Sequence, residues 1–184
     1  QSEKVFPRFS VIDPRHQLSL PRRQIANGVV DTFVHVVEQY LTYPVDARVQ
    51  DRFSEGLMRT LVEIGPRVLD NPQDLSLRAN LAMAATMGLN GLIATGVPED
   101  WATHLIGHEL TALFGLDHAV SLAVVLPALL RDQFEAKRAK LAQCGARVFD
   151  VVEVDEELAA RKTIDAIESF LRVMIGKIRL SDYG

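Results

Sequence analysis

Apolar positions in this chain recur every three to four residues from about residue 22 onward, which is the spacing of helices that bury one face. Turn residues interrupt this spacing: Pro44, the "DNPQD" stretch, and Gly96 followed by Pro98. We expect the pair Gly65 and Pro66 to kink or end the helix in which it lies. The pattern predicts helices over residues 22–42, 46–70, 75–95, 99–114, 118–131, 134–150 and 156–175.

The N-terminal residues follow a different pattern. The stretch "KVFPRFSVI", residues 4–12, predicts a β-strand, and Pro7 would confine that strand to the edge of a sheet. The stretch "DPRHQLSLP", residues 13–21, reads as a linker punctuated by proline. Because one strand cannot form a sheet, we expect an all-α chain with one leftover N-terminal strand whose partners lie elsewhere.

Composition limits the classes of function. The chain has 184 residues and a formal net charge of -4, and it has no basic patch, so we expect no nucleic-acid partner. No apolar run approaches the roughly 18 residues that a membrane span needs, so we expect no membrane partner either. The single cysteine, Cys144, excludes an intramolecular disulfide and suits a reducing compartment. We therefore expect a cytoplasmic protein in which Cys144 packs as a small apolar residue.

The segment "NGVVDTFVHVVEQY" carries the first candidate chemistry. Asp31 and His35 are four residues apart, so a helix presents both side chains on one face. A carboxylate and an imidazole in this arrangement suit a metal ion, and they equally suit a simple hydrogen-bonded pair. Glu38 lies on the same face, where it either orients a ligand or is an ordinary surface glutamate.

The segment "WATHLIGHELTALFGLDH" holds three of the five histidines: His104, His108 and His118. By spacing alone, His104 and His108 could chelate one ion from a single helix face. His118 would lie roughly 21 Å beyond His104 in an unbroken helix. It can share their site only if the chain reverses, and Gly115 with Asp117 provides the signals for a helix end and a new start.

Together the two segments predict a composite metal site with nitrogen and oxygen ligands. Such a donor set favours Zn²⁺, Fe²⁺, Mn²⁺, Co²⁺ or Ni²⁺ over a structural zinc bound by cysteines. The order H-L-I-G-H-E lacks the H-E-x-x-H signature of zinc proteases. The chain also lacks the G-x-G-x-x-G motif and the P-loop that cradle nucleotides.

The chain further contains "DPRHQLSLP", "TGVPEDWATHLIGHELTALFGLDHAVSLAVVLPAL" and a closing "LSDYG". With "NGVVDTFVHVVEQY", these stretches resemble the iron-containing (group III) alcohol dehydrogenase family, and most of all its NADPH-dependent aldehyde reductase and butanol dehydrogenase branch. The resemblance implies the C-terminal helical bundle domain of a dehydroquinate synthase-like two-domain fold. Residues 1–20 would then be a residual strand and linker from the nucleotide-binding domain, and residues 21–184 the helical metal-binding domain.

The resemblance also assigns roles to residues. It implies that Asp31, His35, His104 and His118 bind the metal, and that His108 stands near the substrate and the nicotinamide as the catalytic histidine. The implied reaction is reversible hydride transfer between NADPH or NADH and a small aldehyde or alcohol, with Fe²⁺ or Zn²⁺ as Lewis acid.

Three further expectations follow from this assignment. The chain alone would be inactive, because it carries no recognisable dinucleotide site. A homo-oligomer is expected. The alternative is a helical domain that binds a metal without redox chemistry, such as a hydrolase or a metal-storage protein.

Overall fold

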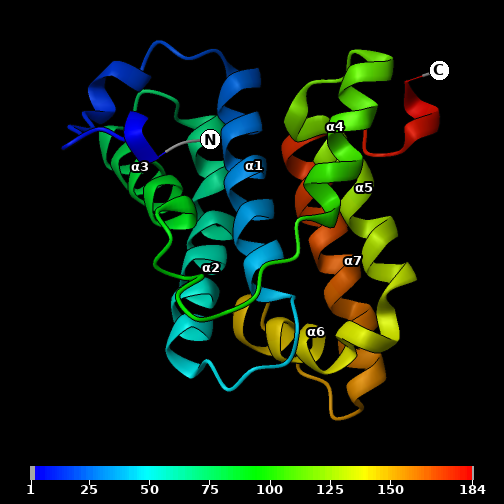
Figure 1. Cartoon of the computed structure of the whole chain (residues 1–184). Helices are drawn as coiled ribbons and strands as arrows, with labels where there is room; N and C mark the ends of the chain where they lie inside the picture. The colour runs from blue at the N-terminus through cyan, green and yellow to red at the C-terminus, as the bar shows by residue number, and fades with distance from the viewer. Residues whose placement is uncertain (1–2, 184) are drawn as a thin grey trace.

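The computed structural model describes residues 3–183, and within that range the chain is helical, as predicted (Figure 1). The seven predicted helices are all present. Their bounds are α1 (Arg22–Tyr40), α2 (Arg48–Asp70), α3 (Leu75–Leu89), α4 (Ala102–Phe114), α5 (His118–Asp132), α6 (Phe134–Val148) and α7 (Glu156–Ile175). Short 3-10 turns lie at η1 (Glu3–Val5), η2 (Pro14–Gln17) and η3 (Leu180–Asp182).

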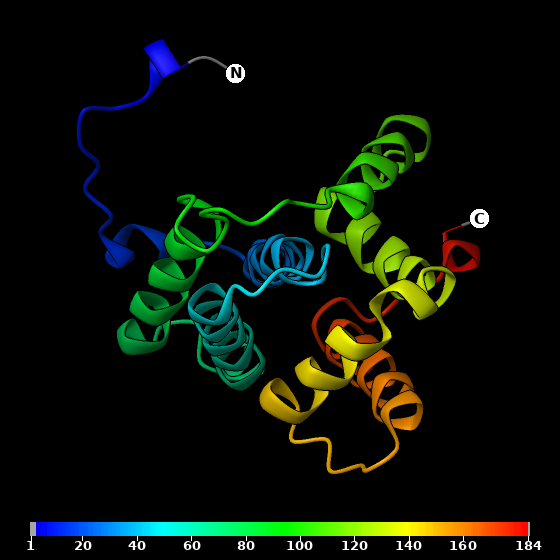
Figure 2. The ribbon, with the colours of Figure 1, turned by 60° about the horizontal axis from the view of Figure 1, so that its bottom comes forward.

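Helix α1 occupies the centre of the bundle. It packs against α2 and α3 on one side and against α5 and α7 on the other, and Figure 2 shows it almost end-on between these helices. Its apolar residues surround the whole helix rather than one stripe, which is typical of a helix buried on all sides. Val29, Val30, Phe33, Val34 and Val36 are each fully buried.

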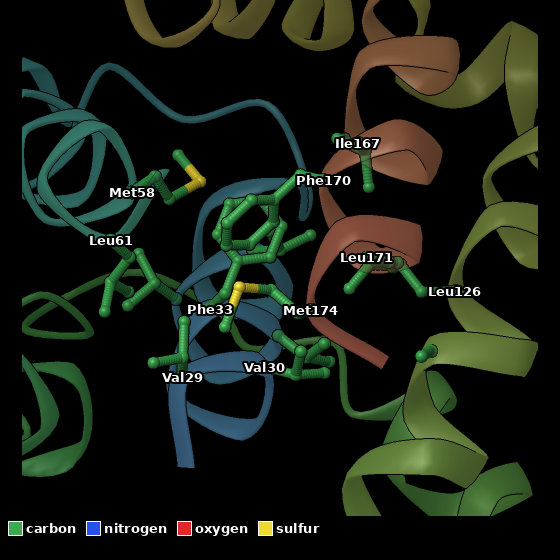
Figure 3. Close-up of a cluster of buried hydrophobic side chains, with 14 of the residues drawn as sticks. Val29, Val30, Phe33, Met58, Leu61, Leu126, Ile167, Phe170, Leu171 and Met174 are labelled. Atoms are coloured by element: carbon green, nitrogen blue, oxygen red, sulfur yellow. The ribbon is translucent and has the colours of Figure 1, made fainter. Parts of the chain in front are cut away.

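The core is built around α1 from side chains of several helices. The ring of Phe33 lies 4.9 Å from the ring of Phe170 on α7, measured between centroids. Burial of each such side chain contributes about 1.5–3 kcal/mol to folding. The labelled side chains in Figure 3 come from α1, α2, α5 and α7: Val29, Val30, Phe33, Met58, Leu61, Leu126, Ile167, Phe170, Leu171 and Met174.

One helix end differs by more than a turn from the prediction, and the pair Gly65 and Pro66 does not end its helix. The helix predicted over 75–95 ends at Leu89, because the side chain of Asn90 accepts a hydrogen bond from the N–H of Leu92 at 3.1 Å and turns the chain. The stretch "GLNGLIATG" therefore lies mostly outside a helix. Pro66 does not end its helix, since α2 continues to Asp70. Packing of α2 against α1, α3, α6 and α7 outweighs the lost backbone hydrogen bond at the proline.

The strand predicted over residues 4–12 is wrong for this chain. Within residues 3–183 the structure has no β-strand, and this segment is a 3-10 turn followed by irregular backbone. A strand forms only when a neighbour satisfies its N–H and C=O groups, and no such neighbour exists in the described range. Phe9 and Val11 are more than four-fifths exposed, so the apolar side chains that suggested a strand lack a surface to cover.

The predicted linker at residues 13–21 includes η2, which packs against α3. The side chain of Asp13 caps this turn by accepting a hydrogen bond from the N–H of Arg15 at 2.9 Å. In the part of the chain that the structure covers, no helix is long and apolar enough to cross a membrane.

Replacing Gly145 by alanine is expected to destabilise the fold by about 1–3 kcal/mol, the usual cost of overpacking a core. A Cβ at Gly145 on α6 would meet the Oγ1 of Thr163 on α7 at 2.0 Å. Thr163 cannot rotate away freely, because its buried hydroxyl donates to the carbonyl of Ala159. The measurement is urea unfolding of both proteins.

Gly56→Ala is the matched control for this substitution. Gly56 also lies inside a helix, α2, but a Cβ there has no atom within 4 Å. Alanine should therefore stabilise the protein by about 0.5–1 kcal/mol through better helix propensity. Equal effects of the two substitutions would contradict the close packing of α6 on α7.

The thiol of Cys144 is expected to be unreactive in the folded protein. It is fully buried, and burial raises its pKa to about 12, so the reactive thiolate is scarce at pH 8. A thiol reagent should modify the folded chain at least about 100-fold more slowly than the chain in denaturing urea. Equal rates in the two conditions would show that Cys144 is accessible.

Candidate metal centre

Asp31 and His35 lie one turn apart on α1, as the sequence pattern predicts. The Nδ1 of His35 is 2.7 Å from the backbone carbonyl oxygen of Asp31. A carbonyl can only accept, so this nitrogen carries the proton and Nε2 keeps its lone pair. The carboxylate oxygen Oδ1 of Asp31 lies 3.3 Å from the same Nδ1. The pair therefore presents one oxygen and one unprotonated nitrogen that could bind a cation.

The chain reverses between α4 and α5, as Gly115 and Asp117 predict. Gly115 follows α4 directly and has a left-handed φ of 66°, a conformation that glycine adopts without steric cost. Asp117 precedes His118, the first residue of α5, but its side chain does not cap that helix. Instead the Oδ2 of Asp117 accepts a hydrogen bond from the Nδ2 of Asn27 at 3.1 Å. This bond ties the turn to α1.

The reversal brings donors from three helices to one point. Oδ1 of Asp31 lies 3.3 Å from Nε2 of His118 and 3.6 Å from Nε2 of His104. Donor atoms of Asp31, His35 and His104 all lie within 4.8 Å of one another. Four donors about 2.1 Å from a tetrahedral ion are separated by roughly 3.4 Å. The observed separations from Asp31 are close to that value.

Two of these donor atoms are buried without a partner. Oδ1 of Asp31 and Nε2 of His104 have no hydrogen bond within residues 3–183. An unpaired buried polar atom is costly, and its usual explanation is a ligand, an ion or a water. The donor set and its unsatisfied atoms therefore fit a divalent cation held by nitrogen and oxygen.

Glu38 orients His104 from the next turn of α1. Its carboxylate is almost fully buried, and Oε2 is in hydrogen-bond contact with Nδ1 of His104. The other oxygen, Oε1, accepts from the backbone N–H of Thr103 at 2.5 Å and from that of His104 at 3.3 Å. A proton on Nδ1 leaves the lone pair of Nε2 directed at Asp31. Of the two interpretations of Glu38, this contact favours the one in which it orients a ligand.

The carboxylates and imidazoles shift one another's pKa values. Burial alone would lower the pKa of His104, but the neighbouring carboxylates of Asp31 and Glu38 outweigh burial and raise it to about 9. Burial would raise the pKa of Asp31, but the nearby imidazoles of His104 and His35 hold it well below its usual range. A cation that binds at Nε2 of His104 must displace a proton, so its apparent affinity should fall with falling pH.

His118 and His108 differ in their surroundings. Burial and the neighbouring imidazoles lower the pKa of His118, which keeps it neutral and able to bind a cation near pH 7. His108 is exposed, and its ring centroid is 5.1 Å from that of His118 and 6.2 Å from that of His104. The ring of His118 lies 5.2 Å from that of His104, and its Nε2 is 3.3 Å from Oδ1 of Asp31, whereas His108 makes no such contact with Asp31. His108 therefore lies at the rim of the cluster, while His16 is exposed in η2.

Two features near the cluster had little signal in the sequence. Trp101 lies beside His35 and His104, and its position three residues before His104 was the available hint. An open cavity of about 370 Å³ adjoins Asp31 and His118. It is lined by side chains from α1, α5 and the turn before α5: Gln24, Asn27, Gly28, Asp31, Asp117, His118 and Ala119.

Comparison with known proteins adds to this geometry. The model of the Fe-containing alcohol dehydrogenase family, C-terminal part, matches residues 25–184. The NADPH-dependent aldehyde reductase YqhD of Escherichia coli (strain K12) is 52% identical over 183 residues, covering 100% of this chain and 47% of that protein. The probable NADH-dependent butanol dehydrogenase 1 of Bacillus subtilis (strain 168) is 36% identical over 185 residues, covering 99% of this chain and 48% of that protein.

Solved structures agree with the sequence comparisons. The substrate- and cofactor-free form of the aldehyde reductase YqhD from E. coli superposes with a TM-score of 0.96 at 52% identity, covering 100% of this chain and 48% of that chain. The chain thus spans about half the length of the curated relatives that it matches.

Replacing Glu38 by glutamine is expected to weaken Zn²⁺ binding by roughly 10- to 100-fold. The amide cannot accept hydrogen bonds with both of its atoms, so either Nδ1 of His104 or the backbone N–H groups of the first turn of α4 lose their acceptor. Isothermal titration calorimetry measures the affinity, and a thermal melt confirms that the variant is folded. Glu63→Gln, which removes an exposed carboxylate on α2, should bind Zn²⁺ like the unaltered chain. An unchanged affinity in Glu38→Gln would contradict the orienting role.

Proposed function

This chain belongs to the Fe-containing alcohol dehydrogenase family, and we propose that it forms the metal-binding half of an NAD(P)H-dependent aldehyde reductase. In this proposal residues 21–184 are the metal-binding domain, and residues 1–20 join it to a nucleotide-binding domain. The reaction is reversible hydride transfer between the nicotinamide and an aldehyde or its alcohol. The observation that carries the proposal is the position of Asp31 Oδ1, unpaired and buried among three imidazoles from α1, α4 and α5.

The proposed ligands are Asp31, His35, His104 and His118. Their donor set contains three nitrogens and one oxygen, which suits Fe²⁺ or Zn²⁺. When bound, such an ion supplies a Lewis acid that polarises a carbonyl group and stabilises the corresponding alkoxide. Among the chain's own residues, Glu38 keeps His104 in the tautomer that can bind the ion. The cavity beside Asp31 and His118 gives a small aldehyde room next to the site.

His108 is proposed as the catalytic histidine. Its exposed ring lies beside the ring of His118, and His108 is not among the three imidazoles whose nitrogens lie within 4 Å of Oδ1 of Asp31, so it can approach a substrate without binding the ion. Its imidazole can both donate and accept a proton, which suits it to deliver a proton to the alkoxide oxygen during reduction and to remove it during oxidation.

The nicotinamide cofactor is proposed to be NADP or NAD, bound mainly by residues outside this chain. The E. coli relative is named for NADPH and the B. subtilis relative for NADH, so the family contains both preferences. The 184-residue chain alone should bind metal but lack reductase activity. This proposal disfavours metal binding without redox chemistry, because the related proteins named above are oxidoreductases.

The proposal also covers the cellular location and the oligomeric state of the enzyme. We place it in the cytoplasm, as a homo-oligomer. Exposed apolar side chains on α4, including Leu105, Leu113 and Phe114, support a further protein contact on that side of the bundle.

Two histidine substitutions separate binding from catalysis. His118→Ala should weaken metal binding by at least about 10-fold, because one of four ligands is lost. His108→Ala should bind metal like the unaltered protein and lose about 100-fold in kcat if it relays a proton. Metal affinity is measured by titration of this chain, and kcat with an aldehyde and NADPH in the longer enzyme that contains it.

His16→Ala is the control for both substitutions, because His16 is exposed and lies outside the cluster. It should leave metal affinity and kcat unchanged. If His108→Ala fails to bind metal while His118→Ala still binds it, the ligand pair is His104 with His108. The assignment proposed here would then be wrong.

A further inference from the structure

Trp101, the single tryptophan of the chain, contacts two of the proposed ligands from outside the donor cluster. Its ring centroid lies 5.6 Å from that of His35 and 5.3 Å from that of His104. The interplanar angles are 68° and 81°, so both contacts are edge-to-face. His35 belongs to α1 and His104 to α4, and the indole therefore bridges the two helices that hold most of the donors.

The indole is itself held in place. Its Nε1 donates to Oε2 of Glu99 at 3.0 Å. The next residue along, Asp100, receives a hydrogen bond on Oδ2 from Nζ of Lys137 at 2.7 Å, and its backbone N–H donates to the carbonyl of Glu38 at 3.3 Å. These bonds fix the segment before α4 to α1 and α6. Trp101 is half-buried, and these hydrogen bonds hold its side chain in one position against the two imidazoles.

His35 is the ligand whose orientation depends most on the contact with Trp101. Glu38 orients His104 through a buried carboxylate, whereas Nδ1 of His35 bonds to the backbone carbonyl of its own helix. An edge-to-face contact restricts the rotation of an imidazole about its side-chain bonds. A ligand that is already restricted loses less rotational freedom when it binds the ion. An imidazole that binds a cation also becomes more positive, and contact with the electron-rich indole favours that form.

We propose that Trp101 is a positioning residue that holds the rings of His35 and His104 in the orientation needed to bind one cation. The inference rests on the proposed function, because it assumes that these two histidines are ligands. It adds that part of the metal affinity comes from an aromatic contact outside the ligand set. Trp101 acts through the two imidazoles and contributes no ligand atom.

The test compares Trp101→Ala with Trp101→Phe in the 184-residue chain. Alanine removes both ring contacts and should weaken Zn²⁺ binding by about 10-fold or more, the usual cost of losing a group that orients a ligand. Phenylalanine keeps an aromatic ring and should restore binding to within about 3-fold of the unaltered chain. Calorimetry gives the affinity, and thermal melts report stability separately. Phe53→Leu, which shortens an exposed aromatic side chain on α2, should bind Zn²⁺ normally.

The outcomes separate this inference from the proposed function. If the unaltered chain is folded and binds no Zn²⁺, both are overturned. If the unaltered chain and Trp101→Ala bind Zn²⁺ equally well, the metal site stands and the role of Trp101 is overturned, even if the variant melts at a lower temperature. A phenylalanine variant as weak as the alanine variant also overturns it, because the indole N–H rather than the ring contacts would then be responsible.

Fluorescence supplies a second readout. Because Trp101 is the only tryptophan, the indole emission of the chain reports on this position alone. Co²⁺ should quench that emission, and the affinity obtained from quenching should equal the affinity for Co²⁺ measured by calorimetry. Binding by calorimetry without quenching would place the ion away from Trp101 and overturn the inference.

Discussion

The near-complete burial of residues 29–40 of α1 is the constraint on which the rest of the structure depends. Such a helix cannot carry charged groups unless each finds a partner within the bundle. Asp31, His35 and Glu38 lie along the side of α1 that meets α4 and α5. The need to satisfy these groups fixes where α4 begins, because Glu38 accepts from the first backbone N–H groups of that helix. The contacts of Glu38 therefore both pack α4 against α1 and orient a residue of the candidate metal centre.

Local sequence patterns predicted the helices well because most of them have one clear apolar face and a turn signal at each end. The departures from prediction occurred where contacts that the apolar spacing does not encode decide the outcome. The side chain of Asn90 bonds to the N–H of Leu92 and ends α3 early, and α2 runs through Pro66 to the end predicted from its apolar spacing. The segment at residues 4–12 has the composition of a strand but no neighbour to pair with in the described range. Periodicity contains no information about such partners.

The candidate site was predictable in part. Spacing placed Asp31 with His35 and located the turn that brings His118 back toward His104. It could not choose between His108 and His118, since i, i+4 spacing favours the former on geometry within one helix. Only the family resemblance made that choice. Spacing placed Glu38 on the face of Asp31 and His35 but left its role open. The contacts of Glu38 and Trp101 with His104 join different segments, and spacing within one segment does not reveal them.

The separation in sequence between the donors has a thermodynamic consequence. An ion held by α1, α4 and α5 would cross-link segments that are far apart along the chain, much as a disulfide closes a long loop. Binding energy of this kind counts toward folding, because the unfolded chain has no such arrangement of donors. At a free metal concentration 100 times Kd, the gain would be about 2.7 kcal/mol, a large fraction of the stability of an ordinary domain. A chelator would then act as a mild denaturant, and the melting temperature would follow the metal content of the buffer.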